Sequence, residues 1–207
     1  MNKEMSRKIG ILISGRGSNM EAIIKSSLEH RISAQVVIVI SDNQQAGGIT
    51  IAQSLGIATQ VIERKSFASK EEFEKEIILC LKNCQVDLLC LAGFMRILSP
   101  FIVKEFAGKI LNIHPALLPS FPGLHAQKQA LDYGAKISGA TVHFVDEGVD
   151  TGPVIIQTAV PVFDNDTEEI LSLRILEQEH KIYSEAIRFF FEGNLRIEGR
   201  KVIKKVP

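Results

Sequence analysis

Near its N-terminus the chain reads Lys8-Ile9-Gly10-Ile11-Leu12-Ile13-Ser14-Gly15-Arg16-Gly17-Ser18-Asn19. An unbroken apolar run of this length is typical of a strand that is buried on both faces. The glycines that follow allow a tight turn, and the next stretch, with Ile23, Ile24 and Leu28 on one side, predicts an amphipathic helix. Together they predict the strand, glycine loop and helix with which many α/β folds begin.

Apolar runs continue to alternate with amphipathic stretches along the chain, which is the pattern of stacked βαβ units. The pattern predicts a Rossmann-like, doubly wound α/β fold with a mostly parallel sheet and a mixed C-terminal part. We expect a single domain over 1–207, with a first half over about 8–110, a second half over about 111–192, and a short C-terminal strand or tail over 193–207. The predicted strands are Lys8–Ser14, Val36–Ser41, Ala58–Ile62, Asp87–Ala92, Lys109–Ile113, Ser138–Phe144 and Val154–Val162; the predicted helices are Asn19–Glu29, Ala46–Leu55, Ser66–Asn83, Pro100–Phe106, His125–Tyr133 and Thr167–Glu192; the predicted loops are Leu111–Gly123 and Asp146–Pro153.

Composition narrows the class of protein. Lysine plus arginine number 24 and aspartate plus glutamate number 24, so there is no net positive charge to attract nucleic acid, and the basic run Arg200–Lys205 is interpreted as a solvated terminus. No apolar stretch reaches the roughly 18 residues of a membrane span, and the first apolar run is too short for a signal peptide. Cys80, Cys84 and Cys90 lack the spacing of metal ligands. We expect a cytoplasmic protein without a metal, either a monomer or a weak homodimer.

The glycine loop Gly15-Arg16-Gly17-Ser18-Asn19 is a candidate anion site, because backbone amides and the helix dipole favour a negative charge there. It is not a dinucleotide fingerprint, which needs a third glycine where Met20 stands, and no Gly-Lys-Ser/Thr follows to make a P-loop. Two interpretations are equally good: a phosphate site with donors from Ser18 and Asn19, or a plain turn that caps the helix. Asp42 similarly either binds a ribose or belongs to a turn.

Two polar side chains lie at the end of the predicted strand Lys109–Ile113. Asn112 and His114 are two residues apart, and because a strand has a period of two, both side chains should leave the same face. An amide donor beside an imidazole suits a developing oxyanion and a proton transfer. Taken alone, the pair is equally compatible with an ordinary strand end.

The stretch Gly139–Pro153 predicts a strand followed by an acidic, glycine-bearing loop. A carboxylate that reached the imidazole of His114 from this loop would orient the ring and raise its pKa. Asp146, Glu147 and Asp150 are all candidates for that carboxylate, and spacing alone does not choose among them.

Four motifs carry a resemblance that spans almost the whole chain. The sequence resembles the phosphoribosylglycinamide formyltransferases, folate-dependent enzymes of purine biosynthesis. The resemblance implies 10-formyltetrahydrofolate as formyl donor and 5-phosphoribosylglycinamide as acceptor. The motifs are Ser14-Gly15-Arg16-Gly17-Ser18-Asn19, Leu91-Ala92-Gly93-Phe94-Met95-Arg96-Ile97-Leu98, Asn112-Ile113-His114-Pro115 and Gly139–Pro153.

The resemblance also implies roles for individual residues. It assigns catalysis to Asn112, His114 and Asp150, and contacts with the phosphorylated substrate to Gly17, Ser18, Asn19 and Glu179. It assigns folate contacts to Lys70, Met95, Arg96, Ile97, Leu98, Asn112, Asp146, Glu147, Gly148 and Val149. Lys70 stands where arginine is usual in this family, and a lysine keeps the charge but loses the bidentate fork.

Other functions remain as alternatives. A formyltetrahydrofolate hydrolase and a methionyl-tRNA formyltransferase share these motifs, although the tRNA enzyme needs a basic surface that a neutral chain does not offer. A non-catalytic module that binds a nucleotide or a folate would explain the glycine loop. Such a module would leave Asn112, His114 and Asp150 without a purpose.

Overall fold

The computed structural model describes residues 7–204 of the 207-residue chain. The chain divides into two compact units, Met1–Ile110 and Leu111–Pro207. This boundary lies near residue 110, and the single domain over 1–207 stays a prediction. No helix among residues 7–204 is long and apolar enough to cross a membrane.

The first unit contains a parallel sheet with the strand order β3-β2-β1-β4. Its central strands are almost completely buried, as the continuous apolar runs predict, because helices flank them. Helix α1 packs beside α2, and α3 packs beside α4. The elements are β1 (Lys8–Ile13), α1 (Ser18–Leu28), β2 (Gln35–Ser41), α2 (Gly47–Ser54), β3 (Thr59–Val61), the 3-10 turn η1 (Arg64–Ser66), α3 (Lys70–Asn83), β4 (Leu88–Leu91) and α4 (Pro100–Glu105).

The start of α3 differs from the prediction, which placed it at Ser66. The helix begins at Lys70, because the hydroxyl of Ser69 accepts a hydrogen bond from the amide of Glu72 at 3.0 Å. The Glu72 carboxylate in turn accepts from the amide of Ala68 at 3.0 Å. This reciprocal cap sets the first residue of the helix, although apolar spacing continues back to Phe67.

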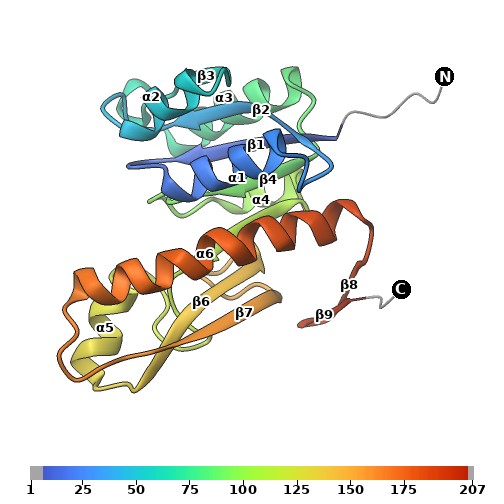
Figure 1. Cartoon of the computed structure of the whole chain (residues 1–207). Coiled ribbons are helices and arrows are strands. Elements are labelled where there is room, and N and C mark those ends of the chain that lie inside the picture. The colour runs from blue at the N-terminus through green and yellow to red at the C-terminus, as the bar shows by residue number, and fades with distance from the viewer. Residues whose placement is uncertain (1–6, 205–207) are drawn as a thin grey trace. The chain divides into compact units, whose positions relative to one another are not determined.

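The second unit contains an antiparallel arrangement in the order β5-β6-β7, followed by β9 and β8. The long helix α6 packs along β6 and β7 (Figure 1). Its buried Tyr183 donates a hydrogen bond to the carbonyl of Leu111 at 2.9 Å, which ties the helix to the start of the unit. The elements are β5 (Ile110–His114), α5 (Ala126–Tyr133), β6 (Ile137–Phe144), β7 (Val154–Pro161), α6 (Glu168–Phe191), β8 (Leu195–Glu198) and β9 (Lys201–Lys204).

The α/β prediction with a parallel first half and a mixed C-terminal part is confirmed, with two corrections in the second unit. The predicted loop Leu111–Gly123 is a strand as far as His114, in keeping with the overlapping prediction of a strand over Lys109–Ile113. The basic run is not simply a solvated terminus, because β9 pairs with β7 at Val154 and Lys201, and the Arg200 guanidinium donates to the carbonyl of Thr151 at 3.1 Å. Lys205, the last residue of that run, lies outside the described residues.

Close approach of β6 and β7 makes Gly139 a sensitive position. A Cβ atom there would lie 2.0 Å from the carbonyl oxygen of Thr158 and 2.9 Å from Leu117. We expect Gly139→Ala to lower the free energy of unfolding by about 3 kcal/mol, because the two strands must move apart. Urea denaturation measures this. Gly47→Ala is the control, since its Cβ would meet no atom within 4 Å, and an equal loss in both variants would contradict the prediction.

Candidate active site

Strand β5 delivers Asn112 and His114 together, and β6 faces them. The two strands are antiparallel with Asn112 opposite His143 and His114 opposite Thr141. The amide nitrogen of Asn112 lies 3.2 Å from Nε2 of His143. The period-two argument therefore places both predicted side chains on one face, and it places two polar side chains of β6 beside them.

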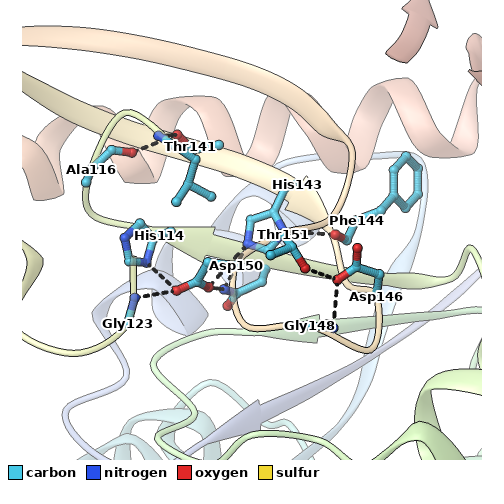
Figure 2. A network of polar contacts seen from close by, with 12 residues as sticks. His114, Ala116, Gly123, Thr141, His143, Phe144, Asp146, Gly148, Asp150 and Thr151 are labelled. Atoms are coloured by element: carbon cyan, nitrogen blue, oxygen red, sulfur yellow. Dashed lines mark hydrogen bonds and ion pairs between the residues drawn. The ribbon is translucent and has the colours of Figure 1, made fainter. Parts of the chain in front are cut away.

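Asp150 lies between two imidazole rings (Figure 2). Its Oδ2 is 3.3 Å from Nδ1 of His114 and accepts from the amide of Gly123 at 2.8 Å. Its Oδ1 is 3.4 Å from the amide nitrogen of Asn112 and 3.6 Å from Nε2 of His143. Of the three carboxylates that spacing left open, Asp150 is the one that contacts the His114 ring.

The loop after β6 has the shape needed to present this carboxylate. Asp146 accepts hydrogen bonds from the amide of Gly148 at 3.1 Å and from the hydroxyl of Thr151 at 2.6 Å, so it closes the loop on itself (Figure 2). A Cβ at Gly152 would lie 1.7 Å from the carbonyl oxygen of Phe144, so only glycine fits there. Asp150 has φ of 53°, a left-handed conformation that non-glycine residues seldom adopt and that occurs often at functional sites.

Burial and charge oppose each other at this cluster. Burial lowers the pKa of the His114 imidazole below its usual value, while Asp150 and a hydrogen bond to the Phe121 carbonyl act in the other direction. Burial acts to raise the pKa of the Asp150 carboxyl group, but the contact with His143, the hydrogen bond from Gly123 and the nearby His114 hold it below its usual value. The carboxylate is therefore ionised at neutral pH, and it favours a proton on a neighbouring ring.

His143 is a residue of this cluster that the sequence reasoning did not single out. It is 2% exposed, and its Nδ1 lies 2.8 Å from the carbonyl of Phe144. A carbonyl only accepts, so the network assigns a proton to Nδ1 and leaves Nε2 to face Asn112 and Asp150. The signal was present, because Thr141 and His143 alternate along β6 in the same way as Asn112 and His114 along β5.

The glycine loop of the first unit lies between β1 and α1. Gly17 has φ of 78°, and no side chain caps the helix that follows, so the cap interpretation of Ser18 and Asn19 is not supported. A Cβ at Gly17 would lie 2.7 Å from Cα of Gly48, which donates its amide to Gly15 at 3.1 Å. The glycines thus let two helix N-termini approach each other closely, with α2 beside α1.

The segment Gly93–Ser99 follows β4, which neighbours β1. The sheet order reverses between these two strands, and open α/β sheets bind their ligands at such a switch point. Met95 and Ile97 are 62% and 61% exposed, whereas Leu98 is buried. Arg96 forms an ion pair with Asp42, so the Asp42 carboxylate is engaged by a side chain of its own unit.

The remaining predicted residues have the following surroundings within their own units. Lys70, in the first unit, is 3.9 Å from Glu74. Glu179, in the second unit, is a buried residue of α6. Glu147, Gly148 and Val149 are exposed at the tip of the loop that Asp146 closes. Among the described residues, no group of three or more histidine, cysteine, aspartate or glutamate side chains is placed to hold a metal ion.

Comparison with known proteins identifies this arrangement of motifs. A family model described as formyl transferase matches residues 7–187 of the chain. The chain belongs to the formyl transferase family. The match includes both the glycine loop of the first unit and the cluster of Asn112, His114, His143 and Asp150.

Members of the formyl transferase family resemble the chain over most of its length. It is 44% identical over 189 residues to the phosphoribosylglycinamide formyltransferase of Escherichia coli, covering 91% of this chain and 89% of that one. Glycinamide ribonucleotide transformylase 1 from Symbiobacterium toebii is 48% identical to this chain, with a TM-score of 0.96, and the match covers 95% of that protein. The trifunctional purine biosynthetic protein adenosine-3 of Drosophila melanogaster is 47% identical over 199 residues, and the chain spans 15% of its length.

The opposing effects on His114 can be separated in solution. Asp150→Asn removes the charge that raises the pKa of His114 and leaves the burial that lowers it, so this pKa is expected to fall further. Imidazole ¹⁵N chemical shifts measured against pH report it. Asp146→Asn is the control, because Asp146 contacts Gly148 and Thr151 on the same loop. A His114 titration that is unchanged in Asp150→Asn would contradict the assigned electrostatics.

Proposed function

We propose that this formyl transferase moves the formyl group of 10-formyltetrahydrofolate onto the amine of 5-phosphoribosylglycinamide, giving the N-formyl product and tetrahydrofolate in de novo purine biosynthesis. The observation that carries the proposal is the Asp150 carboxylate between His114 and His143, with the Asn112 amide beside it. Similarity to the Escherichia coli phosphoribosylglycinamide formyltransferase over 91% of the chain supports the choice of substrates.

The first chemical step is the attack of the neutral amine on the formyl carbon. A carbon–nitrogen bond forms, and the carbonyl electrons move to oxygen, which becomes an oxyanion. The Asn112 amide donates to this oxyanion. This amide lies 3.2 Å from His143 and 3.4 Å from Asp150. The bond to Asp150 is the longer and weaker of the two, so it is the bond that the substrate displaces.

The second step moves a proton from the attacking nitrogen to the departing folate nitrogen as the old carbon–nitrogen bond breaks. Asp150 stabilises the imidazolium of His114 through Nδ1. Nε2 of His114 donates to the carbonyl of Phe121 at 2.8 Å, so a donation from Nε2 to the oxyanion requires this contact to be exchanged. Substrate binding would therefore shift the Phe121–Gly123 segment.

The proposed binding residues are those that the resemblance to phosphoribosylglycinamide formyltransferases implies. Backbone amides of Gly17, Ser18 and Asn19 bind the phosphate at the N-terminus of α1, and Glu179 contacts the same substrate. The folate contacts Met95, Arg96, Ile97 and Leu98, and Asp146, Glu147, Gly148 and Val149 line the pteridine site. Lys70 is the weakest of these assignments, because its ammonium group lies near Glu74.

The remaining parts of the proposal concern the setting of the reaction. Folate enters as a co-substrate, and no metal ion is required, because a formyl group bound to an aromatic amine is already activated. Residues 1–207 would act as one formyltransferase domain, cytoplasmic and without a nucleic-acid partner, as a monomer or a weak homodimer. The near-zero charge balance supports the absence of a nucleic-acid partner.

Deformylation of a 10-formylfolate, followed by absorbance with and without 5-phosphoribosylglycinamide, tests the function. Turnover is expected only with the ribonucleotide. Asn112→Ala and His114→Ala should each lower kcat by about 10²–10³, because each removes one stabilising donor. Asp150→Asn should abolish most of the turnover. Equal turnover without the ribonucleotide would establish a hydrolase, and folate binding without turnover would establish a binding module.

His143 should also affect the rate, through Asn112 and Asp150. His143→Leu removes the ring nitrogen that faces both side chains, so kcat is expected to fall by about tenfold, less than in Asn112→Ala, whose donor is lost altogether. Steady-state kinetics measure this. Ser138→Ala is the matched control on β6, because this buried hydroxyl makes no hydrogen bond within residues 7–204. A rate unchanged by His143→Leu would remove His143 from the mechanism.

A further inference from the structure

A buried carboxylate in the first unit has no part in the proposed chemistry. Glu74 lies on the apolar face of α3, beside Phe73 and Ile77, and is only 1% exposed. Burying an ionised carboxylate is costly unless hydrogen bonds and a counter-charge compensate for the lost water. The contacts of Glu74 therefore indicate what this burial achieves.

Both oxygens of Glu74 are directed at one residue. Oε1 accepts from the backbone amide of Ser99 at 2.8 Å, and Oε2 accepts from the hydroxyl of Ser99. The ammonium group of Lys70, one turn earlier on α3, lies 3.9 Å from Oε1 and is half-exposed. Two charge-assisted hydrogen bonds thus fix the position of Ser99, and Lys70 balances the charge.

Ser99 ends the segment Gly93–Ser99, and Ser14 fixes its other end. The amide of Ser14 donates to the carbonyl of Gly93 at 3.0 Å, and the amide of Met95 donates to the hydroxyl of Ser14 at 2.9 Å. Because Ser14 directly follows β1, these bonds attach the segment to the switch point of the sheet.

The middle of the segment is held as well. Arg96 pairs with Asp42, and its guanidinium lies 5.9 Å from the ring centroid of Phe73, the neighbour of Glu74. Anchored in this way, the segment leaves the apolar side chains of Met95 and Ile97 exposed while Leu98 is buried. A fixed backbone with exposed apolar side chains is suited to a flat aromatic ligand, since little conformational entropy is lost on binding.

We propose that Glu74 is a positioning residue for folate: its carboxylate sets the conformation of Gly93–Ser99 through Ser99, and this segment receives the folate co-substrate. The inference rests on the proposed function and deepens it, because it assigns Lys70 to balancing Glu74 rather than to the folate tail. A carboxylate that only tied α3 to α4 would affect stability and leave folate affinity unchanged.

The test uses Glu74→Gln, which keeps the shape and removes the charge. The KM for 10-formyltetrahydrofolate is expected to rise about tenfold, with kcat and the KM for 5-phosphoribosylglycinamide within about twofold of wild type. Glu71→Gln is the matched control on α3, because Glu71 is exposed and pairs with Lys75 at 2.7 Å. An unchanged KM for the folate in folded Glu74→Gln would overturn the proposal.

A double-mutant cycle with Ser99→Ala tests the route of the effect. If Glu74 acts through Ser99, the increases in KM from the two substitutions are not additive, and independent effects would overturn the assignment. Ser99→Ala alone should raise the folate KM in the same direction, which covers a failure of Glu74→Gln to fold.

Calorimetric binding of tetrahydrofolate separates this proposal from the proposed function. Binding that is weakened about tenfold in Glu74→Gln would support the positioning role even if the wild-type protein transferred no formyl group. Equal binding by wild type and Glu74→Gln would reject the role even if transfer were observed.

Discussion

The second unit depends on the compensation of one half-buried carboxylate. Asp150 lies in the loop after β6, and an ionised group that has lost part of its water is stable only where polar groups compensate for that loss. The amides of Gly123 and Asn112 donate to it, and the rings of His114 and His143 flank it. These groups come from β5, from β6 and from the loop that follows β5. The packing of these elements therefore also determines how the charge of the site is compensated.

The backbone conformation of these elements also fixes the groups around Asp150. Phe121 and His125, like Asp150, have left-handed φ values, of 53° and 58°, which persist only where the surrounding structure enforces them. The buried hydroxyl of Thr141 donates to the carbonyl of Ala116 at 2.7 Å (Figure 2). It also accepts from the amide of Leu118 at 3.1 Å. These bonds fix the loop that supplies Gly123, so the donors need little rearrangement during a reaction.

Sequence reasoning succeeded where periodicity decides and failed where contacts between distant residues decide. Apolar runs predicted the strands, and the period of two placed Asn112 and His114 on one face. It did not identify His143, because a single histidine within an apolar strand is usually structural. The burial of Glu74 could not be predicted either, because its surroundings have the composition of an exposed helix face: Lys70-Glu71-Glu72-Phe73-Glu74-Lys75-Glu76. Its burial and its partner Ser99, 25 residues away, distinguish this glutamate from its neighbours.

The hydrogen bonds also show which ring nitrogens of the cluster carry protons. Nε2 of His114 is bonded to the carbonyl of Phe121, and Nδ1 of His143 to the carbonyl of Phe144, so these two nitrogens carry the protons of the neutral rings. With both rings neutral, the lone pairs of Nδ1 of His114 and Nε2 of His143 would face the charged Asp150, which is repulsive. One additional proton, on either of these two nitrogens, relieves the repulsion. Formyl transfer to an amine has one proton to move, and these two nitrogens, which face the Asp150 carboxylate, are where the cluster can receive it.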